Sequence, residues 1–459
     1  MPSSLVDADL SSVLHPVTDF KQLRRRGPLI IMEGHGIYVR DDQGHEYIEG
    51  MAGLWCVALG YGVPELAEAA REQISRLAYA PLFAGKSHEP AIRLAQKLQS
   101  WAPGVAGKVF FGNSGSDAND TQIKLIRYYN NALGRPQKKK IISRLRAYHG
   151  VTIAAASLTG LAVNHAMFDL PMPGVLHVEN PHHYRFAEAG ETEEQFATRL
   201  AASLEARILA EGPDTIAAFI AEPLMGAGGV ILPPRTYFEK VQAVLERFDI
   251  LLIDDEVICG FGRTGYKFGA ECFGMRPKTM SVAKAMSSGY LPISAVFVPD
   301  DLYEVLVEPS SANGVFGHGF TYSGHPVACA VSLRNLELME ERNIVAHARQ
   351  VGMHFQSRLT RLGEHSLVGE ARGVGLIGAL ELVANKPRKT VFSPAARVGP
   401  QCSDRCQEQG LIVRNIGDSI ALCPPLVITI SEIDELFDRL ERALDATALW
   451  ARQNGHLVS

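Results

Sequence analysis

The sequence predicts an α/β protein whose larger domain has a mostly parallel sheet covered by helices. Short apolar runs recur along the chain between longer segments with helical periodicity. The runs are apolar throughout, which is typical of strands buried on both faces of a parallel sheet. The 459 residues, 46% of them hydrophobic, are enough for a large core and more than one domain.

Residues 1–61 are predicted to form an arm and then a small hairpin that belongs to a second domain. Residues 36–40 and 45–49 have strand-like composition. They flank the sequence Asp41-Asp-Gln-Gly44, which is typical of a turn.

Residues 62–330 are predicted to form the large domain. A helical period runs through residues 64–74, and a second helix is expected over residues 237–248. The apolar runs that predict strands lie at residues 108–111, 140–142, 215–220, 250–253, 279–283 and 293–298.

Residues 331–459 are predicted to form a smaller α+β domain together with the N-terminal segment. A helical stretch runs over residues 325–362 with a break near Asn343, and strand-like pieces follow at 375–383 and 411–413. The sequence Thr429-Ile-Ser-Glu432 is a capping box that predicts a last helix, to about residue 452.

Composition excludes several functions. The net charge of −5 gives no reason to expect a nucleic-acid partner, and no apolar run reaches the roughly 20 residues of a membrane span. The seven cysteines fit neither a disulfide framework nor a zinc site, and the acidic start lacks a signal peptide's apolar core. We therefore expect a soluble cytoplasmic protein without nucleic-acid or membrane partners.

The strongest chemical signal is the pair Asp255 and Lys284, because each ends an apolar run. Pyridoxal phosphate needs a lysine amine for its covalent attachment and an acid that keeps its ring nitrogen protonated. Asp254 and Glu256 flank Asp255, so the sequence leaves the identity of that acid open by one residue. The period of a strand places both neighbours on the face opposite Asp255.

Three further segments complete a possible cofactor site. A strand, the turn Gly112-Asn-Ser-Gly-Ser-Asp117 and a helix start would bind a phosphate, with donors from Ser114 and Ser116. Tyr148 follows the next strand and suits stacking on a flat ring. Thr321 offers a hydroxyl just before another helix. Each segment alone is more often an ordinary structural turn.

Together these residues make the chain resemble the class III aminotransferases, pyridoxal-phosphate enzymes of fold type I, and among them the bacterial ω-transaminases (amine:pyruvate aminotransferases). The resemblance covers almost the whole chain. The motifs that carry it are Gly50-Met-Ala-Gly-Leu-Trp-Cys56, Asn113-Ser-Gly-Ser116, Tyr148-His-Gly150, Asp255-Glu-Val-Ile-Cys-Gly-Phe-Gly-Arg-Thr-Gly265, Lys284, Gly317-His-Gly-Phe-Thr321 and Ala371-Arg-Gly-Val-Gly375.

The resemblance implies a role for each site residue. Lys284 would hold the cofactor and shuttle a proton, Asp255 would pair with the ring nitrogen, and Thr321 would reach the phosphate of the neighbouring subunit. The implied cofactor site comprises Ser114, Gly115, Ser116, Tyr148, His149, Glu222, Asp255, Val257, Lys284, Phe320 and Thr321. The implied substrate pocket comprises Trp55, Phe83, Tyr148 and Arg414, with Arg414 holding a carboxylate.

The resemblance also implies the reaction. An amino group would move from a primary amine, diamine or ω-amino acid to pyruvate, giving L-alanine by a ping-pong mechanism, in a homodimer or larger assembly with shared active sites. Sulfonates similar to taurine and arylalkyl amines also remain possible donors. The segment 80–84 is less aromatic than is common in this subgroup, which leaves the donor pocket open.

Several other interpretations remain. The same cofactor and fold support decarboxylases, aminomutases and racemases. Ser281-Val-Ala-Lys284 matches the S-x-x-K pattern of serine hydrolases, without that family's other motifs. Gly373-Val-Gly-Leu-Ile-Gly378 matches a dinucleotide fingerprint, but a strand follows where a helix is needed. His182 and His183 lack an acidic companion at ligand spacing, so we expect a surface loop and no metal site.

Overall fold

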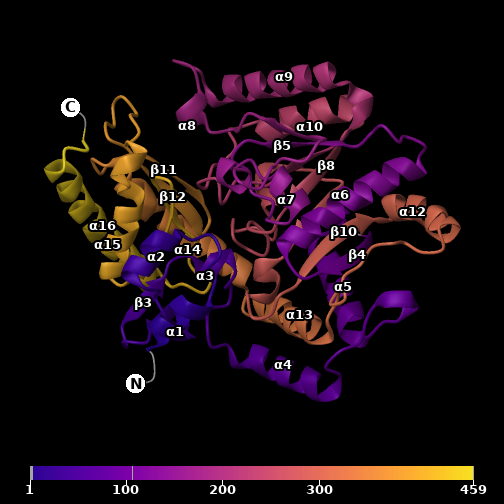
Figure 1. Ribbon diagram of the computed structural model, residues 1–459, viewed down its shortest axis with the longest axis horizontal. Helices are drawn as coiled ribbons and strands as arrows, with labels where there is room; N and C mark the ends of the chain where they lie inside the picture. Colours follow the sequence, from indigo (N-terminus) through magenta and orange to yellow (C-terminus); the bar gives the residue numbers. More distant parts are fainter. Residues whose placement is uncertain (1–3, 106, 458–459) are drawn as a thin grey trace.

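The computed structural model describes residues 4–105 and 107–457. A seven-stranded sheet with the order β4-β10-β9-β8-β7-β5-β6 forms the centre of the larger lobe (Figure 1). Neighbours from β9 through β6 run parallel, whereas β10 is antiparallel to both β4 and β9. The mostly parallel sheet is confirmed. Its strands are β4 (Gly107–Gly112), β5 (Lys140–Arg144), β6 (Val175–Val178), β7 (Ile216–Ala221), β8 (Leu251–Asp255), β9 (Thr279–Val282) and β10 (Ser294–Pro299).

Helices cover both faces of this sheet. Along β7, Ala218 and Ile220 pack on one face, whereas Phe219 and Ala221 pack on the other. Burial on both faces explains why this strand is apolar at every position. One face carries α6 (Gly115–Ala132), α7 (Ile153–Leu158) and α12 (Asp300–Ala312), and the other carries α9 (Glu193–Glu211) and α10 (Tyr237–Arg247).

A group of helices continues the larger lobe below this sheet in Figure 1. The helix expected over residues 64–74 is confirmed as α4 (Pro64–Arg76), which packs with α13 (Pro326–Glu341), and α13 also packs with α5 (Glu89–Trp101). The predicted break near Asn343 is also confirmed. This residue has a φ of 51°, and it separates α13 from α14 (Ile344–Leu362).

The smaller lobe contains both termini and two four-stranded sheets (Figure 1). In the first sheet, β3 pairs in parallel with β13, so that Ile48 lies opposite Leu411 and Glu49 opposite Ile412. The α+β body built from both ends of the chain is therefore confirmed, while the boundaries at 61/62 and 330/331 stay a prediction. The strands are β1 (Ile31–His35), β2 (Tyr38–Asp41), β3 (Glu46–Glu49) and β13 (Leu411–Ile412), and β11 (Val368–Val374), β12 (Ile377–Leu382), β14 (Arg414–Ile416) and β15 (Ser419–Leu422).

Helices pack against these two sheets. The predicted capping box is confirmed, since Thr429 Oγ1 accepts the backbone N–H of Glu432 at the start of α16. The remaining elements here are α1 (Leu5–Ser12), α2 (Phe20–Arg26), α3 (Ala52–Trp55), α15 (Val398–Glu408) and α16 (Ile430–Gln453), while the larger lobe also has α8 (His183–Phe186) and α11 (Gly269–Phe273). Within the described ranges, every helix is too short or too polar to cross a membrane.

Candidate active site

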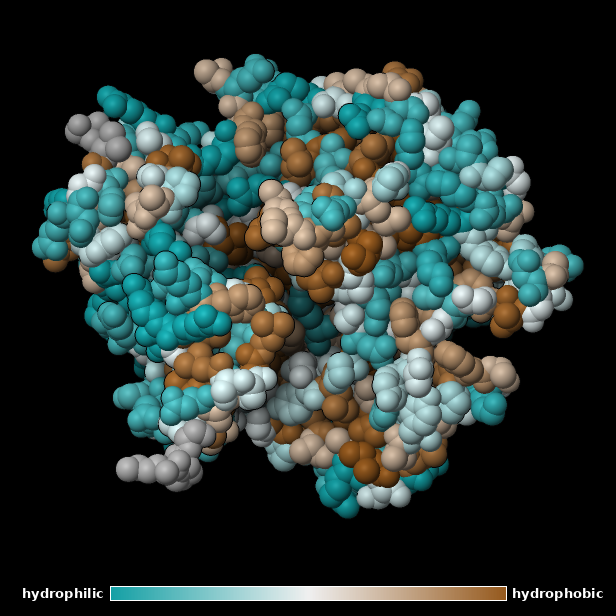
Figure 2. All heavy atoms as spheres, viewed as in Figure 1, coloured by the Kyte–Doolittle hydropathy of each residue, from teal (hydrophilic) through white to brown (hydrophobic). Residues whose placement is uncertain are grey.

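A cavity of about 110 Å³ lies at the carboxyl ends of the central strands. Figure 2 shows a hollow near the middle of this view, with apolar side chains around it. Lining residues follow β4, β5, β7, β8 and β9, which is where open α/β sheets bind ligands. They are Gly115, Ser116, Asn119, Tyr148, His149, Gly150, Glu222, Asp255, Val257, Ile258 and Lys284.

Asp255 ends β8 and is 4% exposed. Its Oδ2 accepts a hydrogen bond from Asn119 Nδ2 at 2.7 Å and lies 2.7 Å from His149 Nδ1. Its Oδ1 accepts the N–H of Val257 at 3.1 Å. These partners fix the orientation of the carboxylate and stabilise its charge.

The two acids beside Asp255 lie outside the cavity lining. Glu256 accepts the backbone N–H groups of Gly269 and Ala270, at 2.9 and 2.6 Å, at the start of α11. Asp254 is fully buried. The alternation of a strand therefore makes Asp255 the acid at the cavity, among the three that the sequence left open.

Lys284 follows β9 and opens a short 3-10 turn with a φ of 47°. Burial lowers the pKa of its amine, while the nearby Cys56 thiol and the carboxylates of Asp255 and Glu222 oppose that shift. A lysine with a lowered pKa is more often neutral, and the neutral amine is the nucleophile that attacks carbonyl carbon.

The start of α6 lies at the cavity, where it could bind an anion. A Cβ on Gly115 would lie 2.9 Å from Val257 Cγ1, so glycine allows the helix start to approach that side chain. Ser116 lines the cavity and its Oγ accepts the N–H of Val151 at 3.1 Å. Ser114 is instead the helix cap, because its Oγ accepts the N–H of Asp117 at 3.2 Å. Free N–H groups and the helix dipole favour a phosphate here.

Glu222 fixes the segment that carries Tyr148. Its carboxylate accepts the backbone N–H of Tyr148 and that of Gly226, each at 3.0 Å. Complete burial raises the pKa of Glu222, and burial likewise raises the pKa of the Tyr148 phenol. Both residues line the cavity, so the Tyr148 ring is held beside it by a backbone contact.

Arg414 begins β14, and the charge of its guanidinium adds to the lowering of the Lys284 pKa and opposes the rise that burial causes in the Tyr148 pKa. Burial lowers the pKa of Arg414 itself. Within residues 4–105 and 107–457, no hydrogen bond or ion pair to its side chain is found. Arg414 is partly buried, and arginines removed from water are normally paired, so this guanidinium is available to a carboxylate from outside the chain.

Trp55 lies behind the cavity wall. The indole is 2% exposed and packs in an apolar cluster with Val230 and Ile258, and Ile258 lines the cavity. Trp55 itself is not among the lining residues, so it borders the cavity through Ile258.

Phe83, Phe320 and Thr321 lie apart from this cavity, and we call them the outward group. Phe83 is 49% exposed, and a Cβ on Gly319 would lie 2.9 Å from its ring. Thr321 is exposed, and its carbonyl accepts the hydroxyl of Tyr79 at 2.7 Å. A single chain therefore separates the predicted site residues into two groups.

The sequence prediction missed Asn119 and Ile258. Asn119 contacts Asp255 and donates to the carbonyl of His149 at 2.8 Å. A signal for it existed, because Asn119 is four residues after Gly115 and so faces the same side of α6.

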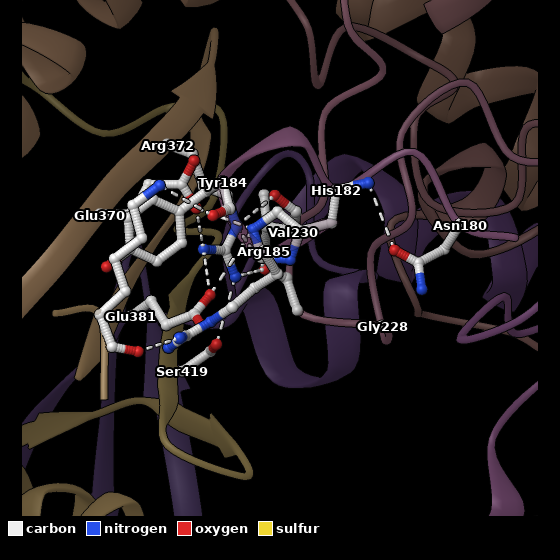
Figure 3. Close-up of polar contacts among 12 residues, drawn as sticks. Asn180, His182, Tyr184, Arg185, Gly228, Val230, Glu370, Arg372, Glu381 and Ser419 are labelled. Carbon is white, nitrogen blue, oxygen red and sulfur yellow. Dashed lines mark hydrogen bonds and ion pairs between the residues drawn. The ribbon is translucent and has the colours of Figure 1, made fainter. Parts of the chain in front are cut away.

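The expectation that His182 lies in a surface loop is wrong (Figure 3). Its side chain is buried, and Nε2 lies 2.8 Å from Glu370 Oε2, with Glu381 Oε2 at 3.6 Å. These three side chains are near enough to share a metal ion. Arg372 Nη1, however, donates to both carboxylates at 2.6 Å, so a guanidinium already holds this position. Acidic companions far away in the sequence were invisible to the spacing argument, and the absence of a metal stays a prediction.

The S-x-x-K motif at Ser281 and the dinucleotide-like motif at Gly373 both lack the structural context that their chemistry needs. Ser281 lies within β9, and its Oγ accepts a hydrogen bond from Gln122 Nε2 at 3.1 Å, whereas an S-x-x-K serine should open a helix. Gly373 and Gly378 pair across the hairpin of β11 and β12 instead of leading into a helix.

Comparisons with known proteins agree with this geometry. The family model described as Aminotransferase class-III matches residues 21–444. An omega transaminase from Pseudomonas jessenii, solved in complex with PMP, is 54% identical with a TM-score of 0.96, over 98% of this chain and 99% of that chain. A transaminase solved with L-alanine is 55% identical with a TM-score of 0.91, over 92% and 99% of the two chains. The chloroplastic gamma aminobutyrate transaminase 3 of Solanum lycopersicum is 50% identical over 92% of this chain and 81% of its own.

Proposed function

The chain belongs to the class III aminotransferases and uses pyridoxal 5′-phosphate, and from this premise we propose that it is an ω-transaminase. It moves an amino group from a primary amine, diamine or ω-amino acid to pyruvate, which becomes L-alanine, by a ping-pong mechanism. The observation that carries this proposal is the partly buried guanidinium of Arg414, which lacks a partner among the described residues and lies near Lys284 and Tyr148.

The residues around the cavity fit the cofactor. We assign its phosphate to the α6 start at Gly115 and Ser116, its ring nitrogen to Asp255, and its ring faces to Val257 and Tyr148. The exclusion of a Cβ at Gly115 supports this assignment, because it lets the helix start, with its free N–H groups, lie close to Val257 at the cavity. When bound, the cofactor supplies the electron sink that makes a carbon–hydrogen bond next to nitrogen acidic.

The chain's own groups then handle the proton. Lys284 Nζ would hold the cofactor between turnovers, and its amine, once displaced by the donor, would act as the general base and acid. It would remove the proton from the donor carbon that carries the nitrogen and would return a proton on the cofactor side. The fixed carboxylate of Asp255 would keep the ring nitrogen protonated.

Arg414 interacts differently with the two substrates. In the acceptor half-reaction, its guanidinium binds the carboxylate of pyruvate in a bidentate contact. In the donor half-reaction, an apolar amine meets the wall formed by Ile258 and Trp55, and the arginine turns away. The names of the relatives, gamma aminobutyrate transaminase and omega transaminase, support a donor whose amino group lies away from any carboxylate.

We further propose a homodimer or larger assembly whose sites are shared. The outward group supports this, since Thr321 and Phe83 are exposed in one chain. The Phe83 ring packs against Gly319, two residues before Thr321. In such an assembly, Thr321 and Phe320 reach the partner's phosphate, and Phe83 lines the partner's donor pocket. The seven unpaired cysteines support a reducing, cytoplasmic location.

The visible absorption spectrum tests the proposed function. Purified protein should show a yellow band that bleaches on addition of 1-phenylethylamine or a diamine and returns with pyruvate. A band that bleaches with the amine but does not return with pyruvate would contradict the acceptor. A protein without the band, even after incubation with pyridoxal phosphate, would contradict the cofactor assignment.

A further inference from the structure

The turn that carries Trp55 has an unfavourable backbone. Ala52 and Trp55 have φ angles of 49° and 65°, and Gly53 between them has 66°. Residues other than glycine rarely adopt such angles, and they persist where surrounding contacts hold them. The turn therefore needs a fixed anchor.

Glu49 supplies that anchor. It is the last residue of β3 and is 4% exposed. Its Oε2 accepts a short hydrogen bond from the backbone N–H of Gly53, and the hydroxyl of Tyr61 donates to the same oxygen at 3.4 Å. One carboxylate thus joins the strand end, the middle of the turn and the segment that follows it.

No cation compensates this buried carboxylate. Across residues 4–105 and 107–457, no lysine, arginine or histidine lies within ion-pair distance of Glu49. Burial raises its pKa to about 7, against the opposing hydrogen bonds from Gly53, Met51 and Tyr61. The titratable groups that face it are Tyr61, Cys56 and Cys423, and the charges of Lys284 and Arg263 act on these two thiols. A buried, unpaired acid is costly, and such acids concentrate at functional sites.

The turn packs directly against the segment of Lys284. The Cys56 thiol is near enough to the Lys284 amine to influence its pKa. The backbone N–H groups of Ala58 and Leu59 donate to Ser288 Oγ at 3.2 and 2.9 Å. On the other side, the Trp55 indole packs in the cluster of Ile258, which lines the cavity. The position of this turn therefore fixes part of the cavity wall.

We infer that Glu49 is a positioning residue that holds the Trp55 turn against the cavity wall and thereby sets the preference among amine donors. This inference rests on the proposed transaminase function. Glu49 touches neither substrate nor cofactor, and it acts through the Gly53 N–H on the indole two residues later. An arylalkyl donor, which needs the wall, depends on Glu49 more than a small alkyl amine does.

Three variants test the inference. Glu49→Ala removes the acceptor for Gly53, Glu49→Gln keeps one acceptor oxygen without the charge, and Glu46→Ala is the matched control from the exposed end of the same strand. We expect Glu49→Ala to lower the ratio of kcat/KM for 1-phenylethylamine over isopropylamine by about tenfold. Glu49→Gln should restore the ratio that the unsubstituted protein has below about pH 6, where Glu49 is itself neutral, and Glu46→Ala should keep the ratio at every pH.

The pH profile separates Glu49→Gln from the unsubstituted protein. Glu49 is protonated below its pKa of about 7 and charged above it. The donor ratio should therefore change between about pH 6 and pH 8 in the unsubstituted protein and stay constant with glutamine at this position.

Acrylamide quenching of tryptophan fluorescence tests the same inference without turnover. Glu49→Ala should add a quenchable component that Glu46→Ala lacks, and the addition should vanish in a Trp55→Phe background. If the added component persisted in that background, or if the donor ratio stayed within about twofold of the control, the inference would be wrong. Failure of the unsubstituted protein to transaminate these amines, a diamine or an ω-amino acid with pyruvate would contradict the proposed function, and the quenching result would still decide the role of Glu49.

Discussion

The cavity residues and the outward group differ in how completely one chain builds them. Asp255 is buried at the end of β8, and four strand ends bring its companions to the same edge of the sheet. Thr321 and Phe83 are exposed and lie outside the cavity of Lys284, and Phe83 packs against Gly319, two residues before Thr321. The difference supports the proposals that the proton-transfer machinery is internal to the fold and that the outward group acts beside a second chain. Four substitutions test this division.

The largest effect is expected at the centre of the cavity. Lys284→Ala should lower kcat by at least about 10⁴-fold, because the variant loses both the covalent attachment point and the proton carrier. Single-turnover loss of the amine donor is the measurement. Lys278→Ala, in an exposed ion pair with Asp301, should keep its activity. Ordinary turnover by Lys284→Ala would show that this cavity is not the catalytic site.

Asp255→Asn should lower kcat by roughly 100-fold and weaken cofactor binding, since a neutral amide cannot hold the ring nitrogen protonated. The neighbouring Asp254→Asn is the matched control, because that side chain lies outside the cavity lining. Rates of proton transfer and cofactor titration measure both effects. Equal losses from the two substitutions would contradict the assignment of separate faces.

Arg414→Ala should raise the KM for pyruvate by about 30-fold and leave the KM for 1-phenylethylamine within about threefold. Only the acceptor has a carboxylate for the guanidinium to bind. Steady-state kinetics with each substrate varied in turn give the two values. Similar increases in both would argue against a shared pocket in which the arginine moves.

Thr321→Ala should weaken cofactor binding by about tenfold, because one phosphate donor is lost. Mixed dimers that combine one Thr321→Ala chain with one Lys284→Ala chain test whether the two residues belong to the same site. If each site combines Lys284 of one chain with Thr321 of the other, a mixed dimer contains one intact site and one that lacks both residues. Mixing should therefore restore tight cofactor binding at half of the sites. No restoration in verified mixed dimers would place Thr321 in its own chain's site.

Sequence reasoning predicted the cavity well for a geometric reason. Asp255 and Lys284 each follow an apolar strand, and the carboxyl ends of neighbouring parallel strands meet at one edge. The same logic failed for β11, whose Glu370 and Arg372 look unsuited to a buried strand. They are tolerated because His182 and Glu381, far away in the sequence, satisfy them.

The position of Phe83 also could not be predicted from the sequence. The difference of segment 80–84 from the more aromatic segment of the subgroup stays a prediction, and the contact of the Phe83 ring with Gly319 joins segments far apart in the chain. No local pattern encodes a packing of that kind, because it involves residues far apart in the chain.

The parallel pairing of β3 with β13 constrains when the smaller lobe can fold during synthesis. The segment that leads to Trp55 emerges from the ribosome early, whereas its neighbours in the strand that leads to Arg414 are made near the end. Until then, the edge of β3 has no partner in that sheet and exposes apolar residues such as Ile48. The smaller lobe therefore closes after translation of almost the whole chain, and the nascent protein is most prone to aggregation during this interval.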